Sequence, residues 1–407
     1  MKHRARLCST SADEAGRTIR SVRRAAVTLS LMWLTGLNLR TAIFGIPPVL
    51  PELRHDLGLS YSASGALTAV VLATLGLGSV PGAVLGSRLG AQRTVTFTSI
   101  ALGLAAVARL LPPQIFWVFA GTIALALCVA LAQPSMPVLV RRWYPGSVPR
   151  VSGVYSNGIL VGSTVGASAT PLMDHLFAWQ ATFVLWAGLA LVGGALWAWL
   201  TPRDDAGPGS SRLPKSIGDR RVWQILALFT FQNIAYFTAA TWLPFLLHGQ
   251  SPFYTSLVFL CVNLFPLPLL LLVTVLPWRY PLSSGFYVAA GVITLVGSLG
   301  LLLGLVELTW LSGFLVGLGC GAAFMAALAL PPMVAGDETE ASAFTALVFF
   351  LGYFLAFIGP IVAGWIADAG GTITAAFWPS VGGAALMALM GLVVPRTMAR
   401  KATGSDA

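Results

Sequence analysis

One arginine, Arg40, lies inside an apolar run that carries no other charge between Ala25 and Glu52. Asn38 stands two residues before it, and Pro47 and the proline that follows it come after. A guanidinium presents a planar fork of N–H donors that binds carboxylates and similar anions. An arginine at the centre of a membrane helix costs about 2.5–3.5 kcal/mol on insertion scales. Two readings are open. Arg40 faces a central cavity and binds an anion, or it is structural, with its long side chain extending to the outer membrane surface or satisfying carbonyls freed near Pro47 and Pro48.

A second group of polar residues lies in a later apolar run. Gln232, Asn233 and Tyr236 are spaced i, i+1, i+4, which places them on one side of a helix. We expect them to act as donors that orient the substrate of Arg40. Their alternative fate, which is common in membrane helices, is an interhelical hydrogen bond worth about 0.6–2 kcal/mol. Gln133 and Tyr353 are two further polar residues inside apolar runs and are candidates for the same site.

Two residues near the ends of apolar runs have two readings each. Arg109 precedes a Pro-Pro pair by three residues, so its side chain is expected to anchor at the outer membrane surface or to form an anion vestibule. Trp242 is either a polar group of the site or an aromatic anchor at the membrane interface.

Acidic residues are missing from the middle of the apolar runs. All 14 can be placed in tails, loops or at the ends of runs, and the four histidines lie in the N-terminal tail or near the outer ends. Proton-driven exporters of cations usually hold a carboxylate inside the membrane, so this class is disfavoured. We also expect no enzyme, no cofactor and no metal, because catalysis at a membrane face would require acidic, histidine or metal-binding clusters. A membrane-embedded transferase is the remote alternative.

The composition indicates an all-α membrane protein. Of the 407 residues, 57% are hydrophobic and 9% are charged, against about 25% charged in an ordinary soluble domain. A helix needs about 20 apolar residues to cross a bilayer. The sequence predicts twelve such spans, at about 25–50, 63–86, 94–112, 115–140, 150–173, 179–200, 222–247, 253–277, 284–306, 309–334, 340–367 and 374–395.

The net charge of +10 reflects topology rather than a nucleic-acid partner. If the N-terminus is cytoplasmic, all but three of the 24 basic residues lie in cytoplasmic tails or loops, the exceptions being Arg40, Arg54 and Arg109. We therefore expect a multi-pass protein of the plasma (inner) membrane with both termini in the cytoplasm. The basic segment before Ala25 is read as a cytoplasmic tail and not as a signal peptide.

The chain divides after the sixth span. A polar stretch rich in Pro, Gly and Ser predicts a linker there. The two halves show weak similarity, because Asn38 aligns with Asn233 and Gly162 with Gly352. The expected organisation is an N-terminal tail, a six-helix bundle, a linker, a second six-helix bundle and a C-terminal tail, over residues 1–24, 25–200, 201–221, 222–395 and 396–407. Parallel six-helix repeats are the architecture of the major facilitator superfamily, with the substrate site between the halves.

Two sets of residues are candidates for conformational change. The segment after the second span resembles the cytoplasmic loop motif of that superfamily, with Ser87 where the motif usually has Asp. The matching residues are Gly82, Arg88, Gly90 and Arg93. Gly158 and Gly162 are spaced for close packing of helices, and we read them as structural or sliding surfaces.

Several segments in the same order resemble the cyanate/nitroimidazole transport family of the major facilitator superfamily. They read NLRTAI, PPVLPELRHDLGLS, MPVLVRRWYP, FQNIAYFTAATWLP and LGYFLAFIGPIVAGWIADAGG. The resemblance implies a twelve-helix transporter and functional roles at Asn38, Arg40, Gln232, Tyr236, Tyr353, Gly359 and Pro360.

The chain also departs from the family pattern. Gln133 stands near where Asn is usual, Phe349 stands where the family tends to have Gln, and the family's arginine after the tenth span is missing. These departures favour a substrate that is larger or less polar than cyanate.

The sequence as a whole predicts a transporter in which two bundles rock about a midplane site. The expected cargo is a small anion or an anionic organic compound, cyanate-like, with Arg40 as its counter-charge. The alternative is an exporter of neutral or nitroaromatic toxic compounds, in which Arg40 contacts a nitro group or is structural. The expected surroundings are the lipid bilayer, and we expect a monomer that binds no nucleic acid.

Overall fold

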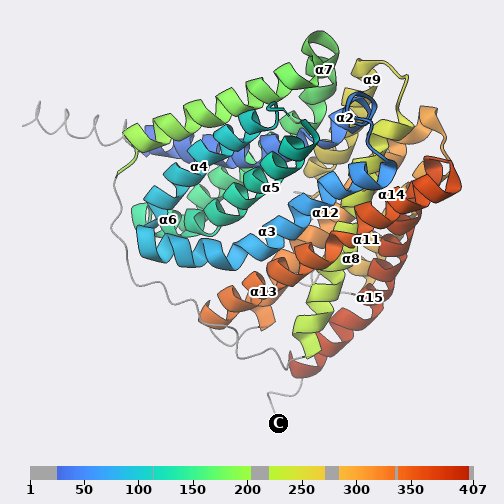
Figure 1. The fold of residues 1–407 in the computed structure, drawn as a ribbon. Coiled ribbons are helices and arrows are strands. Elements are labelled where there is room, and N and C mark those ends of the chain that lie inside the picture. The colour runs from blue at the N-terminus through green and yellow to red at the C-terminus, as the bar shows by residue number, and fades with distance from the viewer. Residues whose placement is uncertain (1–24, 113, 203–219, 271–283, 335–337, 403–407) are drawn as a thin grey trace, which may run out of the picture.

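The computed structural model describes residues 25–112, 114–202, 220–270, 284–334 and 338–402, and the regular structure in these ranges is helical (Figure 1). The first helix is described over residues 25–44. The elements after it are η1 (Pro47–Val49), α2 (Leu50–Leu57), α3 (Tyr61–Leu89), α4 (Ala91–Ala108), α5 (Gln114–Ala132), α6 (Ser135–Trp143), α7 (Val148–Leu200), α8 (Arg220–Leu246), α9 (Pro252–Asn263), α11 (Ser284–Leu302), η4 (Val306–Leu308), α12 (Thr309–Val334), α13 (Glu338–Ala356), α14 (Ile358–Gly370), η5 (Thr374–Phe377) and α15 (Trp378–Ala402).

These helices are consistent with the twelve predicted spans. Nine segments among the described residues are long and apolar enough to cross a membrane. One of them, Arg150–Leu200, has 51 residues, or about 77 Å of helix, which is far more than a bilayer of about 30 Å requires. It reverses at Ala178, whose φ of 63° is not helical, so it supplies two spans. The helices α4 and α8 lie at two further predicted spans.

The predicted tail and linker are largely outside the described ranges. Residues 1–24 and nearly all of 201–221 are not described. At the C-terminal end, α15 continues to Ala402, beyond residue 395 where the last span was expected to end.

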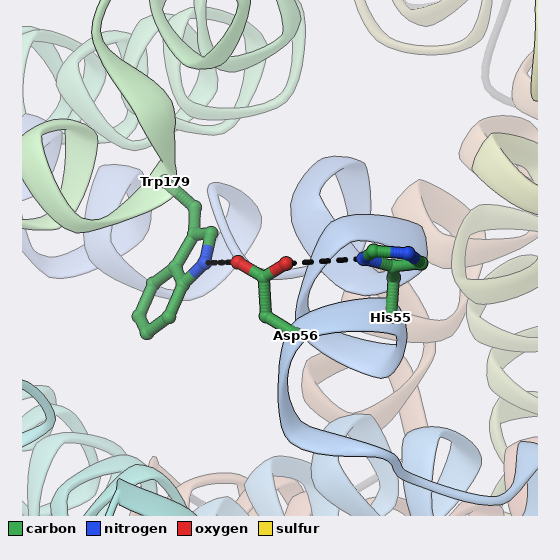
Figure 2. A network of polar contacts seen from close by, with 3 residues as sticks. All are labelled: His55, Asp56 and Trp179. Carbon is green, nitrogen blue, oxygen red and sulfur yellow. Dashed lines mark hydrogen bonds and ion pairs between the residues drawn. The ribbon is translucent and has the colours of Figure 1, made fainter.

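The reversal at Ala178 is held against α2 by a polar contact (Figure 2). The indole Nε1 of Trp179 donates a hydrogen bond to Oδ2 of Asp56 at 2.8 Å, and Oδ1 of Asp56 lies 3.2 Å from Nδ1 of His55. Trp179 itself is buried and packs edge-on against Phe183. Asp56 therefore ties the helix after the first span to the turn between the fifth and sixth spans.

The two halves repeat the same helix packing. Gly162 in the fifth span packs against the main chain of Leu37, and Gly352 in the eleventh span packs against the ring of Phe229. Leu37 and Phe229 lie in the first and seventh spans, so the same pair of spans meets in both halves. Gly158 packs against the main chain of Trp33 in the same way. The prediction that these glycines allow close helix packing is confirmed.

The N-terminal and C-terminal groups of helices, which we call the two bundles, contact each other at the end of the molecule that carries α2, the start of α3 and the end of α14. We call this end the α2 end. There α3 packs against α13 and α14, and α7 packs against α9 (Figure 1). Gly65 of α3 lies directly against the carbonyl of Pro360, and Gly364 of α14 lies against Tyr61. Trp242 is fully buried and packs against Tyr61, with ring centroids 6.0 Å apart. The reading of Trp242 as an interface anchor is therefore wrong.

Arg109 does not reach the membrane surface. Its side chain is 1% exposed, and its guanidinium lies over the ring of Phe183 with Cζ 3.8 Å from the centroid. Because Gly121 of α5 has no side chain, the stem of Arg109 fits against α5. None of the three guanidinium nitrogens has a hydrogen-bond partner among the described residues. The expectation of a surface anchor is wrong, because the arginine turns back into the N-terminal bundle.

We predict that Arg109→Met leaves the protein folded and active. A desolvated cation–π contact contributes about 2 kcal/mol, whereas a buried charge without a partner costs several kcal/mol, so an apolar residue of similar length should be tolerated. Thermal unfolding of the purified protein in detergent should show a midpoint equal to or above that of the wild type, with Arg93→Met as an exposed control. A loss of more than about 3 kcal/mol would contradict this account, because only the removal of one member of a buried pair has that effect.

Candidate functional site

Arg40 lies one turn before the end of the first helix. Pro47 and Pro48 end that helix, because a proline has no N–H to donate and its ring clashes with the carbonyl four residues earlier. The last helical contact is the hydrogen bond from the N–H of Gly45 to the carbonyl of Thr41, at 2.9 Å. The side chain of Arg40 is 8% exposed. It is thus withdrawn from solvent next to a break in the helix.

The neighbours of Arg40 come from both bundles. Its guanidinium lies within electrostatic range of the hydroxyl of Tyr155 in α7 and of the hydroxyl of Tyr236 in α8. In the part of the chain that the structure describes, Arg40 has neither a hydrogen-bond partner nor a carboxylate partner. The hydroxyl of Tyr155 is also buried without a partner. The result is a buried positive charge, with donors beside it, where the two bundles meet.

The polar residues of α8 lie close to this point. The hydroxyl of Tyr236 donates a hydrogen bond to Oδ1 of Asn263 in α9 at 2.6 Å. The side-chain oxygen of Gln232 is buried and has no partner among the described residues. Gln232 and Tyr236 both lie near Cys320 of α12, since the thiol contacts the Gln232 carbonyl and is in electrostatic range of Tyr236. The prediction that Gln232, Asn233 and Tyr236 form one polar group on a single side of the helix stays a prediction, because the Gln232 contact is made by its main chain.

The two asparagines that align in the repeat make main-chain contacts instead. Nδ2 of Asn38 donates to the carbonyl of Leu189 at 3.2 Å, in the second part of α7. Because helical residues two apart point about 200° away from each other, Asn38 projects away from Arg40. Nδ2 of Asn233 donates to the carbonyl of Phe229 in its own helix at 2.7 Å. A role for either asparagine in substrate binding stays a prediction.

Of the two remaining candidates for the site, Tyr353 lies near Tyr236, whereas no contact joins Gln133 to Arg40. The ring of Tyr353 is buried and stacks on Phe349, with centroids 5.9 Å apart and an interplanar angle of 16°. Its hydroxyl is in electrostatic range of Tyr236, so Tyr353 belongs to the same region. Gln133 is half-buried just after the end of α5, and no contact joins it to Arg40.

The residues predicted to act in conformational change lie at helix contacts and turns. Gly82 packs against the main chain of α5, and Gly90 joins α3 to α4 with a φ of 90°, which favours glycine. Arg88 and Arg93 are exposed beside this turn. Gly359 packs against Thr238 and Ile234 of α8, directly before the Pro360 carbonyl that meets α3. Their positions do not test their roles, which stay predictions.

A contact between the bundles that the sequence analysis missed involves Asp368, in the last turn of α14. Its two carboxylate oxygens accept hydrogen bonds from the main-chain N–H groups of Tyr61 and Ser62, at 3.0 and 2.9 Å. These N–H groups begin α3, and Ser60 accepts from the third at 3.0 Å. A carboxylate from the other bundle thus caps the α3 N-terminus, an arrangement favoured by the helix dipole. The sequence carried one indication of this contact: Asp368 is an acid in the last turn of its own helix, where the helix dipole disfavours a negative charge.

Two cavities of very different volume lie beside the two ends of the first helix. At the α2 end, a cavity of about 20 Å³ remains between the bundles, lined by residues that include Phe44, Thr68 and Phe237. That is room for about one water molecule. Toward the other end of the same helix, Trp33 and Val154 line a hollow of about 500 Å³. The two bundles are therefore closely packed at the α2 end, with the small cavity beside Phe44 and Thr68 between them.

Two transporters of Escherichia coli (strain K12) are similar to the chain over most of its length. The cyanate transport protein CynX is 26% identical over 348 residues, which is 84% of this chain and 90% of that protein. The 2-nitroimidazole transporter is 27% identical over 399 residues, 96% of this chain and 98% of that protein. An uncharacterized transporter of Bacillus subtilis (strain 168), YycB, is 27% identical over 340 residues, 81% of this chain and 84% of that protein.

Solved structures share the fold at lower identity. A bacterial homolog of the human lysosomal transporter Spinster superposes with a TM-score of 0.71 at 14% identity, over 91% of this chain and 94% of that one. A structure of a proton dependent oligopeptide transporter gives a TM-score of 0.70 at 15% identity, over 92% of this chain and 99% of that one. The family model described as Major Facilitator Superfamily matches residues 32–279, more than half of the chain. The protein belongs to the Major Facilitator Superfamily.

Proposed function

We propose that this transporter moves a small anion or an anionic organic compound across the plasma membrane by alternating access, with Arg40 as the counter-charge. The observation that carries the proposal is the state of Arg40. It is buried, it lies within electrostatic range of the hydroxyl of a tyrosine in each bundle, and no carboxylate among the described residues pairs with it.

Burying the Arg40 guanidinium without a counter-charge has a free-energy cost. A guanidinium inside a membrane costs about 2.5–3.5 kcal/mol or more, and such residues usually pair with an opposite charge or mark a substrate pathway. A carboxylate or a similar planar anion can accept two parallel hydrogen bonds from the guanidinium fork. A substrate anion would therefore relieve the cost that the empty site carries.

The relatives support an anionic or polar cargo without fixing it. One relative is the cyanate transport protein CynX, and another is a 2-nitroimidazole transporter. At 26–27% identity the substrate can differ between them and this chain. The cyanate-like anion of our proposal rests on Arg40 and not on these names.

Alternating access supplies a role for the α2 end. The basic residues gather at the opposite side of the predicted topology, which supports an external position for the α2 end. With this end closed by the Asp368 cap and the Tyr61–Trp242 contact, the arrangement corresponds to an inward-facing state. Opening toward the outside would require the carboxylate of Asp368 to leave the N-terminus of α3.

The first test is uptake of labelled cyanate, formate, acetate and benzoate into proteoliposomes, with and without a pH gradient. We expect Arg40→Gln to lose saturable uptake of the transported anion by tenfold or more, since it removes the charge from a buried site. Arg40→Lys should retain part of the activity, because it keeps the charge but not the planar fork. Arg150→Gln is the matched control at an exposed position. Equal uptake by the wild type and Arg40→Gln would show that Arg40 is structural.

The second test concerns the Asp368 cap. Asp368→Asn removes the charge that faces the α3 dipole and one of the two oxygen acceptors, and the interaction of a charge with a helix terminus contributes about 0.3–1 kcal/mol. We expect the α2 end to open more often. A cysteine introduced at Thr68, in a variant without native cysteines, should then react several-fold faster with an impermeant maleimide added from outside. Asp56→Asn is the control, because Asp56 contacts Trp179 within one bundle. Unchanged labelling in Asp368→Asn would contradict a role for the cap in closure.

A further inference from the structure

We infer that the anion bound at Arg40 is an aromatic carboxylate, whose ring is recognised by a cluster of aromatic side chains in the C-terminal bundle. This inference rests on the proposed function and names the class of its substrate. We call the cluster the ring cluster. Its members are Phe229 of α8, Phe324 of α12, and Phe349 and Tyr353 of α13.

The ring cluster is organised around Phe229. The ring centroid of Phe229 lies 5.2 Å from those of Phe349 and Tyr353, at interplanar angles of 64° and 78°. On its other side, Phe324 lies 5.9 Å away at 34°. All three separations are within the range that aromatic pairs prefer, and the pairs with Phe349 and Tyr353 are also edge-to-face. Three helices thus present ring faces and edges to one region.

One ring of the cluster is fully buried, whereas two others keep exposed surface. Phe229 is 1% exposed and forms the floor of the cluster. Phe324 and Phe349 are only half-buried, although both pack inward onto Phe229. Both rings therefore keep exposed surface while they pack on Phe229, and in our proposal this surface contacts the ligand. We take these two rings as the walls against which a planar ligand lies.

Tyr236 connects the ring cluster to the charge. Its hydroxyl is in electrostatic range of both the Arg40 guanidinium and the Tyr353 hydroxyl. Its ring lies 6.4 Å from that of Phe44, which is in the same helix as Arg40. A molecule held by Arg40 at one end would therefore meet aromatic rings at the other.

The chemistry of the two ends selects the ligand class. A carboxylate is planar and has two oxygens that match the guanidinium fork. An aryl group gains from stacked and edge-on contacts beyond what its area alone provides. A cation would suit the rings but be repelled by Arg40, and a bare inorganic anion would leave the rings without a contact. An aromatic monocarboxylate such as benzoate satisfies both ends.

The test on the wild-type protein compares three probes of similar size in equilibrium binding to the purified full chain. They are benzoate, cyclohexanecarboxylate, which has the charge without the aromatic ring, and benzamide, which has the ring without the charge. We expect cyclohexanecarboxylate to bind about 3- to 10-fold more weakly than benzoate, the range that an aromatic pair contributes. Equal affinities for the two acids, or transport of cyanate with no binding of benzoate, would overturn the inference and leave the proposed function intact. Benzamide binding as tightly as benzoate would instead contradict the proposed function.

A variant pair tests the ring cluster itself. Phe349→Gln replaces a half-buried ring with a polar side chain, and we expect benzoate affinity to fall about 3- to 10-fold while cyanate uptake, if present, is unchanged. Phe97→Gln is the control, because Phe97 lies on α4 and is 62% exposed. Elution as a single species in size-exclusion chromatography establishes that each variant is folded. Unchanged benzoate affinity in Phe349→Gln would show that the ring cluster is only core packing. If Arg40→Gln at the same time loses binding of both benzoate and cyanate, the proposed function stands and only the inference about the ring cluster fails.

Discussion

A guanidinium held out of water without a counter-charge is the interaction on which this account depends. Arg40 could have been paired by an acid on a neighbouring helix, yet the described groups within its electrostatic range are the hydroxyls of Tyr155 and Tyr236. In a low-dielectric interior, such a charge favours the entry of an anion and disfavours a cation. The break at Pro47 and Pro48 ends the helix one turn later, so the charge lies beside freed main chain rather than in the middle of a regular helix.

In the proposed mechanism, the helix packing makes this position accessible from one side at a time. Glycines allow the first and fifth spans, and the seventh and eleventh, to approach main chain or ring directly, which keeps each bundle rigid. Between the bundles, the contacts are of a different kind. At the α2 end they include a carboxylate on two main-chain N–H groups and an aromatic contact, which can separate without unfolding either bundle. Rigid bundles joined by separable contacts are what alternating access requires.

The sequence predicts much of this fold but only part of the site. Apolar length predicts the spans, and the spacing of Gly158 and Gly162 predicts close packing, because both depend on local pattern. The spacing of Gln232 and Tyr236 likewise predicts a shared helix face. The burial of Arg109 could not be predicted, since it depends on Phe183, which lies about 75 residues away and in another helix. The cap by Asp368 joins residues about 306 positions apart, and no local pattern indicates such a pair.

The sequence could predict only part of the ring cluster. Phe229, Gln232 and Tyr236 follow helical spacing, so the sequence could have placed a ring on the polar face of α8. It could not have shown that rings of α12 and α13 meet Phe229 there, because an aromatic residue in an apolar span most often packs against its neighbours or lipid. Only the arrangement of three helices distinguishes a cavity wall from ordinary packing.

The most direct measurement is a density map of the purified protein with 4-iodobenzoate, in which the iodine marks the ring end of the ligand. The account predicts carboxylate oxygens at about 2.7–2.9 Å from the guanidinium nitrogens of Arg40, the distance of a charge-assisted hydrogen bond. It also places the iodine on the side of Phe349. Ligand density elsewhere in the molecule, with Arg40 in contact only with protein atoms, would contradict the claim that Arg40 binds the anion.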